Sequence, residues 1–298
     1  MKKVLLYIIG VFLCVSVTDI VVGFCCRFYV KNYQLSGRYE PLDRLIKQVD
    51  TDILLIGNSI ILNSLDPQII EDSMSLSCYN GGIIGQGVEF SETIIDCVLQ
   101  RYTPKKIIMG LRPEEMGVSI GEGIYDVLRP YYKLGYKSID EHFENSSKIE
   151  RILLQSNLYR YNTIWVRVLI YLLFDKTDYS RNGFMPHDIP TVLPQMKIID
   201  FCEQPSDEKL KCLERIINKC KNKGVSIYIC FPPTYMSFPQ DPIPCVNRVN
   251  DLCLKNHIPC LIYYNDKEFL TRPEYFFDNI HVNNKGASIF TKKIIKRL

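Results

Sequence analysis

The stretch Asp52-Ile53-Leu54-Leu55-Ile56-Gly57-Asn58-Ser59 decides the fold. Its apolar run is short, ends in glycine and is followed by a polar turn, which is the pattern of a strand buried on both faces of a parallel sheet. We predict four further strands: residues 78–82, with glycines at the exit, residues 106–110, residues 225–231, stopped by Pro232-Pro233, and residues 259–264.

Helical patterns separate these runs. Asp66-Pro67 is typical of an N-cap followed by proline in the first turn, and Ser206 and Gly224 are typical helix boundaries. We expect helices over residues 41–49, 67–74, 88–100, 207–223 and 244–256, and from about residue 284. Strands that alternate with helices predict an α/β domain, a five-stranded parallel sheet with helices on both faces.

The alternation stops between about residues 111 and 200, which we interpret as an insertion into a domain that spans residues 51–298. Residues 158–174 form a strongly apolar helix candidate within it. Its most apolar part is too short to cross a membrane, so a packed helix is favoured, while a lid or a surface that rests on lipid stays open.

The N-terminus carries Lys2 and Lys3 and then an apolar run, residues 4–26, whose single charge is Asp19. The run is long enough to cross a bilayer and lacks a good cleavage site, so an uncleaved anchor is favoured over a signal peptide. We expect a single-pass membrane protein with a stalk and first helix over residues 27–50 and a periplasmic or extracellular domain.

Composition limits the class of partner and cofactor. The chain has 298 residues, 47% of them hydrophobic, and a net charge of +3 whose positive residues are scattered, so we expect no nucleic-acid partner. The twelve cysteines include no C-x-x-C pair, and Cys253, His257 and Cys260 match no zinc spacing. We predict no metal and no cofactor; most cysteines are interpreted as buried hydrophobic residues, and disulfides stay open for an exported chain.

Candidate site residues follow several of the predicted strands. The carboxyl ends of parallel strands form one rim of a sheet, where ligand sites occur. Ser59, Gly82, Gly85, Arg112, Asp278 and His281 all fall on that rim.

A serine hydroxyl becomes a good nucleophile when a base takes its proton. His281 is the best base among four histidines, because Asp278 lies three residues earlier and can hold the imidazole ring in one tautomer. Each motif alone is more typical of a turn, but their joint occurrence on the rim predicts Ser59, His281 and Asp278 as a catalytic triad.

The stretch Asn80-Gly81-Gly82-Ile83-Ile84-Gly85 provides backbone without side chains at three positions. Such a loop can donate N–H groups to a developing oxyanion. It lacks the Gly-Lys-Ser/Thr ending of a phosphate-binding loop, and a simple turn stays an equal alternative.

Together, residues 53–59, the spacing Asn80-x-Gly82-x-x-Gly85 and the block at residues 278–286 resemble the SGNH (GDSL-like) hydrolase superfamily. The resemblance implies a flavodoxin-like three-layer fold and esterase or acyltransferase activity. It implies Ser59 as nucleophile, His281 as base, Asp278 as its orienter, and oxyanion donors at Ser59 and Gly85. Asn80, Gly82 and Arg112 complete the expected oxyanion and substrate-binding set.

One block departs from the family, which has an oxyanion-donating Asn after its third strand. Here that region reads Gly110-Leu111-Arg112-Pro113, so Arg112 either replaces the Asn or forms a structural ion pair. Similar departures occur in membrane-anchored relatives that process cell-surface polymers.

We therefore expect a membrane-tethered serine esterase or O-acyltransferase for ester groups, acetyl among them, on cell-envelope glycans. The alternatives are a catalytically weak or inactive binding or assembly protein of envelope polysaccharide modification, on the same fold, and a metal-dependent phosphoesterase. The phosphoesterase would need a cluster of metal-binding carboxylates and histidines, and Asp52 and Asp66 have no evident histidine partner.

Overall fold

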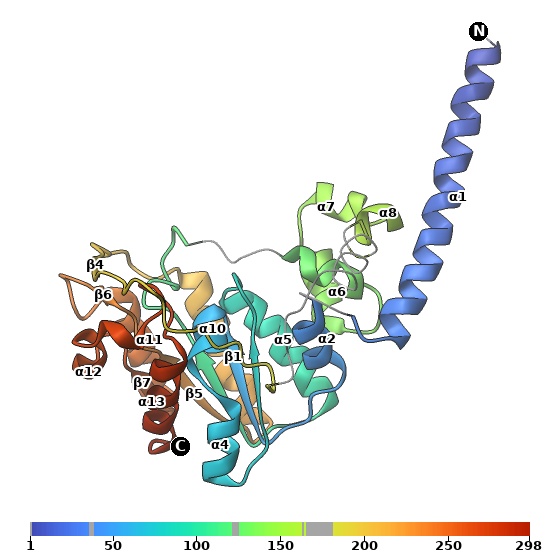
Figure 1. Cartoon of the computed structure of the whole chain (residues 1–298). Helices are drawn as coiled ribbons and strands as arrows, with labels where there is room; N and C mark the ends of the chain where they lie inside the picture. Colours follow the sequence, from blue (N-terminus) through green and yellow to red (C-terminus); the bar gives the residue numbers. More distant parts are fainter. Residues whose placement is uncertain (1, 36–38, 121–124, 163, 165–180) are drawn as a thin grey trace. The chain divides into compact units, whose positions relative to one another are not determined.

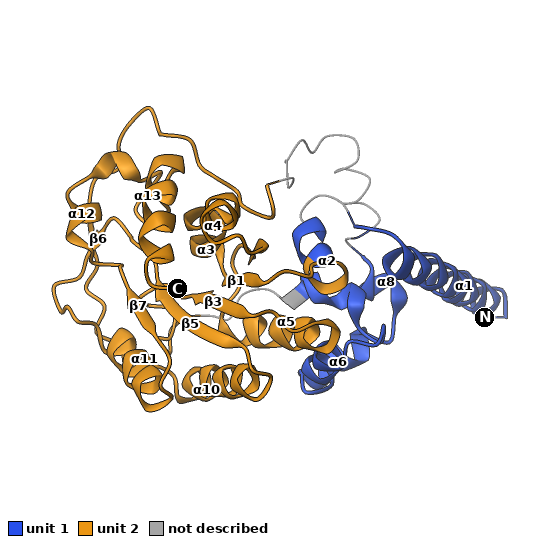
Figure 2. Cartoon of the chain, turned by 90° about the horizontal axis from the view of Figure 1, so that it is seen from below, with its two compact units in different colours: residues 1–44, 125–177 blue, residues 45–124, 178–298 orange. Residues whose placement is uncertain are grey.

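A computed structural model describes residues 2–35, 39–120, 125–162, 164 and 181–298 (Figure 1). The chain forms two compact units, of residues 1–44 with 125–177 and of residues 45–124 with 178–298 (Figure 2). The predicted insertion is therefore divided: its central part forms a unit with the N-terminal helix, and its two flanks belong to the sheet domain.

The larger unit is built on the predicted parallel sheet, whose strand order is β2-β1-β3-β5-β7. Its strands are β1 (Ile53–Gly57), β2 (Cys78–Gly82), β3 (Lys106–Gly110), β5 (Ser226–Phe231) and β7 (Cys260–Ile262). Gly57 of β1 is in register with Gly82 and Gly110, so the three neighbouring strands end at one level. The fold class predicted from the strand pattern is confirmed.

Helices cover both faces of this sheet (Figures 1 and 2). One face packs on α3 (Ser59–Ser64), α4 (Pro67–Met74) and α13 (Asn284–Ile295), together with α12 (Lys267–Leu270) and η3 (Pro273–Tyr275). The other carries α5 (Val88–Arg101) and α10 (Asp207–Asn222), and α11 (Pro244–Lys255) packs beside β7. A small second sheet pairs β4 (Lys197–Ile198) with β6 (Met236–Ser237).

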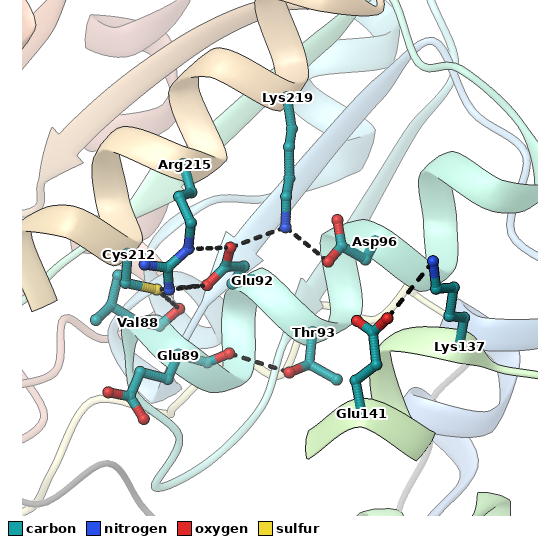
Figure 3. Close-up of polar contacts among 10 residues, drawn as sticks. All are labelled: Val88, Glu89, Glu92, Thr93, Asp96, Lys137, Glu141, Cys212, Arg215 and Lys219. Atoms are coloured by element: carbon teal, nitrogen blue, oxygen red, sulfur yellow. Dashed lines mark hydrogen bonds and ion pairs between the residues drawn. The ribbon is translucent and has the colours of Figure 1, made fainter. Parts of the chain in front are cut away.

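An ion-pair network joins α5 to α10 (Figure 3). Glu92 accepts hydrogen bonds from Arg215 at 2.6 Å and from Lys219 at 2.8 Å, and Lys219 also contacts Asp96 at 2.7 Å. Burial would raise the pKa of Glu92, but its hydrogen bonds from Arg215, Lys219 and Cys212 lower that pKa to about 2. The two helices are thus held in register by charge as well as by apolar packing.

Cysteine side chains lie mostly in the interior, as the sequence predicts. All twelve cysteines are free thiols in the structure, and seven are buried: Cys78, Cys97, Cys212, Cys220, Cys230, Cys245 and Cys253. Burial raises the pKa of Cys220 and of Cys245 to about 12. These thiols therefore act as small apolar side chains in the core.

The smaller unit consists of helices. It holds α1 (Lys2–Asn32), most of α2 (Glu40–Lys47), η2 (Tyr125–Tyr131), α6 (Lys137–Glu144), α7 (Lys148–Leu153) and α8 (Asn157–Arg160). Among the described residues, α1 is the one helix long and apolar enough to cross a membrane. It extends past residue 26 to Asn32, so the first part of the expected stalk is helical. Most of the helix expected over residues 158–174 lies outside the described residues.

A substitution at Gly82 tests how tightly α3 packs on the strand ends. A Cβ there would lie 2.7 Å from the backbone nitrogen of Leu62 and 2.9 Å from the carbonyl oxygen of Asn58. We expect Gly82→Ala to lower stability by about 1–3 kcal/mol, because backbone atoms must move to admit the methyl group. The measurement is the thermal unfolding midpoint of the detergent-solubilised chain.

Gly224→Ala is the control for this experiment. A Cβ at Gly224 meets nothing within 4 Å, although its φ of +71° disfavours side chains. If Gly82→Ala lowered the midpoint no more than Gly224→Ala does, the close packing of α3 would be wrong.

Candidate active site

A tight turn places Ser59 at the end of β1. Gly57 has a φ of +147°, and a Cβ there would lie 2.5 Å from the carbonyl oxygen of Gly110, so only glycine fits. Asn58 caps α3 by accepting a hydrogen bond from the backbone of Ile60 at 2.9 Å. Ser59 is thereby the first residue of α3, at the rim of the sheet.

The second half of the site lies just before α13. Asp278 Oδ1 accepts hydrogen bonds from the backbone N–H groups of Ile280 and His281, each at 2.7 Å. Asn283 caps α13 by accepting from the backbone of Lys285 and Gly286 at 3.0 and 3.1 Å. The chain between Asp278 and α13 is therefore fixed at both ends by side-chain hydrogen bonds.

The structure brings the three predicted catalytic side chains together. His281 Nε2 lies 2.9 Å from Ser59 Oγ, although 222 residues separate them in sequence. His281 Nδ1 lies 2.9 Å from Asp278 Oδ2 and 3.1 Å from Oδ1. In this arrangement Nδ1–H donates to the carboxylate, and the free electron pair of Nε2 faces the serine hydroxyl.

Hydrogen bonds keep the orienting carboxylate ionised. Burial would raise the pKa of Asp278, but the hydrogen bonds from the His281 ring and from the backbone of His281 and Ile280 lower that pKa to about 2. A permanent negative charge at this position stabilises an imidazolium when His281 accepts a proton.

A pocket of about 110 Å³ opens beside the nucleophile. It is lined by Asn58, Ser59, Gly85, Gln86, Gly87, Arg112, Glu115 and Ile120. Gly85 has a φ of +74°, and a Cβ added to it would meet no atom within 4 Å, so its backbone faces open space. Of the residues expected in the oxyanion and substrate-binding set, Gly85 and Arg112 line this pocket.

Asn80 and Gly82 occupy structural positions instead. The Asn80 side chain is fully buried; its amide donates to the carbonyl oxygens of Ile61 at 2.8 Å and Leu65 at 2.9 Å, and its oxygen accepts from Gly82 N at 3.0 Å. The polar groups expected to meet a substrate are thus used to hold α3 against β2. The sequence expectation for these two residues is corrected: they shape the site from behind and do not line it.

Arg112 forms an ion pair and also lines the pocket. Its guanidinium lies 3.5 Å from Glu114 Oε1, which is a long ion pair, and the side chain remains 28% exposed. Within the part of the chain that the structure describes, its Nε is buried without a hydrogen-bond partner. The ion pair with Glu114 therefore leaves donor capacity on a side chain that lines the pocket.

Two residues near the triad were not assigned a role from the sequence. Glu115 is buried, and its Oε2 accepts from Asn58 Nδ2 at 2.7 Å and from Arg112 N at 2.9 Å, which ties the loop after β3 to the loop after β1. A carboxylate five residues beyond a strand on the active rim was the available signal for this contact.

The other is His187, whose ring stacks on Phe277 with centroids 4.2 Å apart and lies 5.7 Å from the His281 ring. Burial lowers the pKa of His187, and the neighbouring His281 lowers it further. The backbone of His187 accepts a hydrogen bond from Asn284 at 2.7 Å, so the segment that carries it is attached to the start of α13. No local motif in the sequence marks this contact.

Metal chemistry would require a different set of side chains. Among the residues that the structure describes, no three His, Cys, Asp or Glu side chains gather as ligands of one ion would. The candidate site instead consists of a hydroxyl, an imidazole and a carboxylate in series, with a small polar pocket beside the hydroxyl.

Comparison with known proteins gives distant likenesses. No family model and no curated protein matches the chain. A G-D-S-L family lipolytic protein from Desulfitobacterium hafniense has a TM-score of 0.43 and 9% identity, over 84% of this chain and 100% of its own. A lipase/acylhydrolase from Enterococcus faecalis has a TM-score of 0.44 and 11% identity, over 82% of this chain and 93% of its own.

An acetylxylan esterase from Geobacillus stearothermophilus, solved as a catalytic mutant, has a TM-score of 0.40 and 12% identity, over 82% of this chain and 92% of its own. Likeness at this level transfers no activity. The function of this chain is therefore inferred from its own sheet topology and from the geometry of its own site.

Proposed function

We propose that this chain is a serine esterase or O-acyltransferase of the SGNH type that carries the acyl group on Ser59. The observation that supports the proposal most strongly is the pair of contacts Ser59–His281 and His281–Asp278, both at 2.9 Å. Side chains in this series perform acyl transfer on unrelated folds, so the chemistry follows from the geometry.

The first half of the reaction forms the acyl-enzyme. Ser59 Oγ attacks the carbonyl carbon of the ester while its proton moves to His281 Nε2, and Asp278 stabilises the resulting imidazolium. The carbonyl oxygen becomes an oxyanion. When the tetrahedral intermediate collapses, the ester bond breaks and the leaving alkoxide accepts from His281 the proton that came from Ser59.

The second half releases the acyl group. A water molecule or a sugar hydroxyl gives its proton to His281 and attacks the acyl carbon, and Ser59 Oγ leaves and recovers that proton. Hydrolysis and transfer therefore use the same residues and differ only in the acceptor.

The oxyanion needs donors beside Ser59. The backbone N–H groups of Ser59 and Gly85 are suitable, since no hydrogen bond from either is found within the described part of the chain. We assign the third donor to the Arg112 guanidinium, which lines the same pocket and stands where the family has Asn. A positive donor at this place would stabilise the developing charge directly.

The proposed setting follows from α1. We propose that this helix anchors the chain as a single membrane span, with the sheet domain outside the cytoplasm and Lys2 and Lys3 inside. The proposed substrates are then ester groups, such as acetyl, on cell-envelope glycans. An inactive binding protein is the weaker candidate, because such a protein has no physical need for the aligned triad.

The first prediction from the proposed function concerns the nucleophile. We expect a fluorophosphonate probe to label the wild-type chain at Ser59, and Ser59→Ala to abolish labelling and lower kcat for a small acetyl ester by at least about 10³-fold. Ser73→Ala, at an exposed position on α4, is the matched control and keeps both properties. Labelling that persists in Ser59→Ala, or a wild-type chain that neither labels nor turns over, would contradict the proposal.

The second prediction concerns Asp278. We expect Asp278→Asn to lower kcat by roughly 10⁴-fold, because a neutral amide neither holds the required tautomer nor stabilises the imidazolium. Retained labelling with fast turnover would show that His281 needs no orienting charge.

Stability gives an independent check on the same residue. Since the pKa of Asp278 is lowered to about 2, its ionised form favours the folded state above about pH 4, and this contribution is lost as the pH falls toward 2. The difference in unfolding midpoint between wild type and Asp278→Asn should therefore shrink between pH 4 and pH 2. A difference that stayed constant over that range would contradict the lowered pKa.

The third prediction concerns Arg112. We expect Arg112→Gln to lower kcat for a small acetyl ester by about 10²-fold with little change in KM, since the donor acts mainly on the transition state. Arg112→Lys keeps the positive charge, so its kcat should lie between that of the wild type and that of Arg112→Gln. Arg248→Gln, at an exposed position on α11, is the control; equal kcat in Arg112→Gln and Arg248→Gln would leave Arg112 as a structural residue only.

A further inference from the structure

Asp19, the single charge in the apolar run of residues 4–26 within α1, has a defined set of partners. Asp19 Oδ1 accepts from Ser156 Oγ at 2.6 Å and from the backbone N–H of Leu158 at 2.9 Å, and Oδ2 accepts from Asn157 Nδ2 at 2.9 Å. The carboxylate therefore binds the start of α8. A charge that would be costly in an anchor helix is here satisfied by three donors of the same unit.

One turn beyond Asp19, α1 and α8 approach so closely that only glycine fits on α1. A Cβ at Gly23 would lie 2.3 Å from the Asn157 side chain, so glycine at this position lets α8 approach. The covered positions of α1 recur at helical spacing and form one stripe: Ser16, Asp19, Val22, Gly23, Cys26, Tyr29 and Val30. The C-terminal half of α1 is thus a docked helix, and apolar side chains outside this stripe, such as Ile20, Phe24 and Phe28, are exposed.

The length of α1 fixes the depth of this contact in a membrane. A hydrocarbon core of about 30 Å takes about 20 helical residues, so a span that begins at Val4 ends near Gly23. Asp19 then lies about 6 Å inside the outer edge of the core. Because Asp19 is bonded to the start of α8, α8 must lie at that same edge.

The neighbouring helix α7 is attached to α8 and turns an apolar face outward. Glu150 on its inner side accepts from Tyr159 of α8 at 2.6 Å and from Arg129 at 2.9 Å, and Leu154 just after it is fully buried. On its outer side, residues at i, i+3 and i+4 are exposed: Ile149 by 72%, Ile152 by 61% and Leu153 by 40%. Lys148 and Arg151 are exposed between these residues.

We propose that α7 is a membrane-interface helix: its Ile149, Ile152 and Leu153 side chains insert among the lipids of the outer leaflet, next to the point where α1 leaves the bilayer. Lys148 and Arg151 then lie at the level of the headgroups, where they attract anionic lipids. The occupant of this apolar face is the bilayer itself, since the Asp19–α8 contact brings the unit to the hydrocarbon edge. The anchor and α7 together hold the unit in the membrane along two elements instead of one.

Fluorescence quenching in vesicles tests the proposal on the full chain. The single natural tryptophan is replaced by Trp165→Phe, and one new tryptophan is placed at Ile152→Trp. The protein is reconstituted in phosphatidylcholine–phosphatidylglycerol vesicles with lipids brominated near the headgroup end of their chains. We expect Ile152→Trp emission to shift to the blue and to lose most of its intensity on bromination.

Two control variants show how a tryptophan deep in the membrane and a tryptophan in water behave in the same experiment. Phe12→Trp, on the exposed apolar surface of α1, is expected to be quenched most by lipids brominated near the chain ends. Leu254→Trp, 64% exposed on α11 of the sheet domain, should emit as a water-exposed tryptophan and resist quenching. Circular dichroism is used to check that all three variants fold.

The proposal is overturned if Ile152→Trp behaves like Leu254→Trp while Phe12→Trp is quenched, because the anchor would then span without α7 in the lipid. It also falls if Phe12→Trp is not quenched, since the depth of Asp19 depends on the span. Neither outcome bears on Ser59, whose labelling is measured separately.

Discussion

The close approach of α3 to the ends of three parallel strands is the constraint on which the site depends. Gly57, Gly82 and Gly110 end these strands in register; a Cβ at Gly82 or Gly110 would push α3 away, and one at Gly57 would meet the carbonyl oxygen of Gly110. This approach lets Asn58 cap the helix and places the Ser59 hydroxyl at the rim. The buried Asn80 amide fixes the other side of α3 by donating to two carbonyl oxygens, those of Ile61 and Leu65. The nucleophile is therefore positioned by backbone packing, and the polar residues around it mainly satisfy the hydrogen bonds that this packing leaves.

The sequence predicts the sheet domain well because its signals are local. Apolar runs that end in glycine mark β1 and β3, glycines mark the end of β2, and Asp66-Pro67 marks the start of α4 as the structure has it. The joint position of Ser59 and Asp278–His281 could be expected as well, because the carboxyl ends of parallel strands share a rim. Here a simple topological rule replaces knowledge of long-range contacts.

What the sequence did not predict depends on contacts between distant segments. Nothing near His187 indicates that its ring stacks on Phe277 beside His281, and the contact of Glu115 with Asn58 joins two loops that are far apart in sequence. The spacing Asn80-x-Gly82-x-x-Gly85 places Asn80 in the substrate-binding set, but its amide, on a buried strand, donates to carbonyl groups in and just after α3 instead. Likewise, Asp19 looked out of place in an apolar helix until its partners in α8 were known. In each case the decisive group is polar and its partner is far away in sequence.

The burial of cysteine thiols in the core limits their reaction with oxidants. Thiol–disulfide exchange requires a thiolate and access to it, and burial denies both at Cys220 and Cys245, whose pKa is raised to about 12. Once the domain has folded, these two thiols are thus protected from disulfide formation. The unfolded chain has no such protection. In an oxidising compartment, the sheet must therefore fold before its cysteines form disulfides.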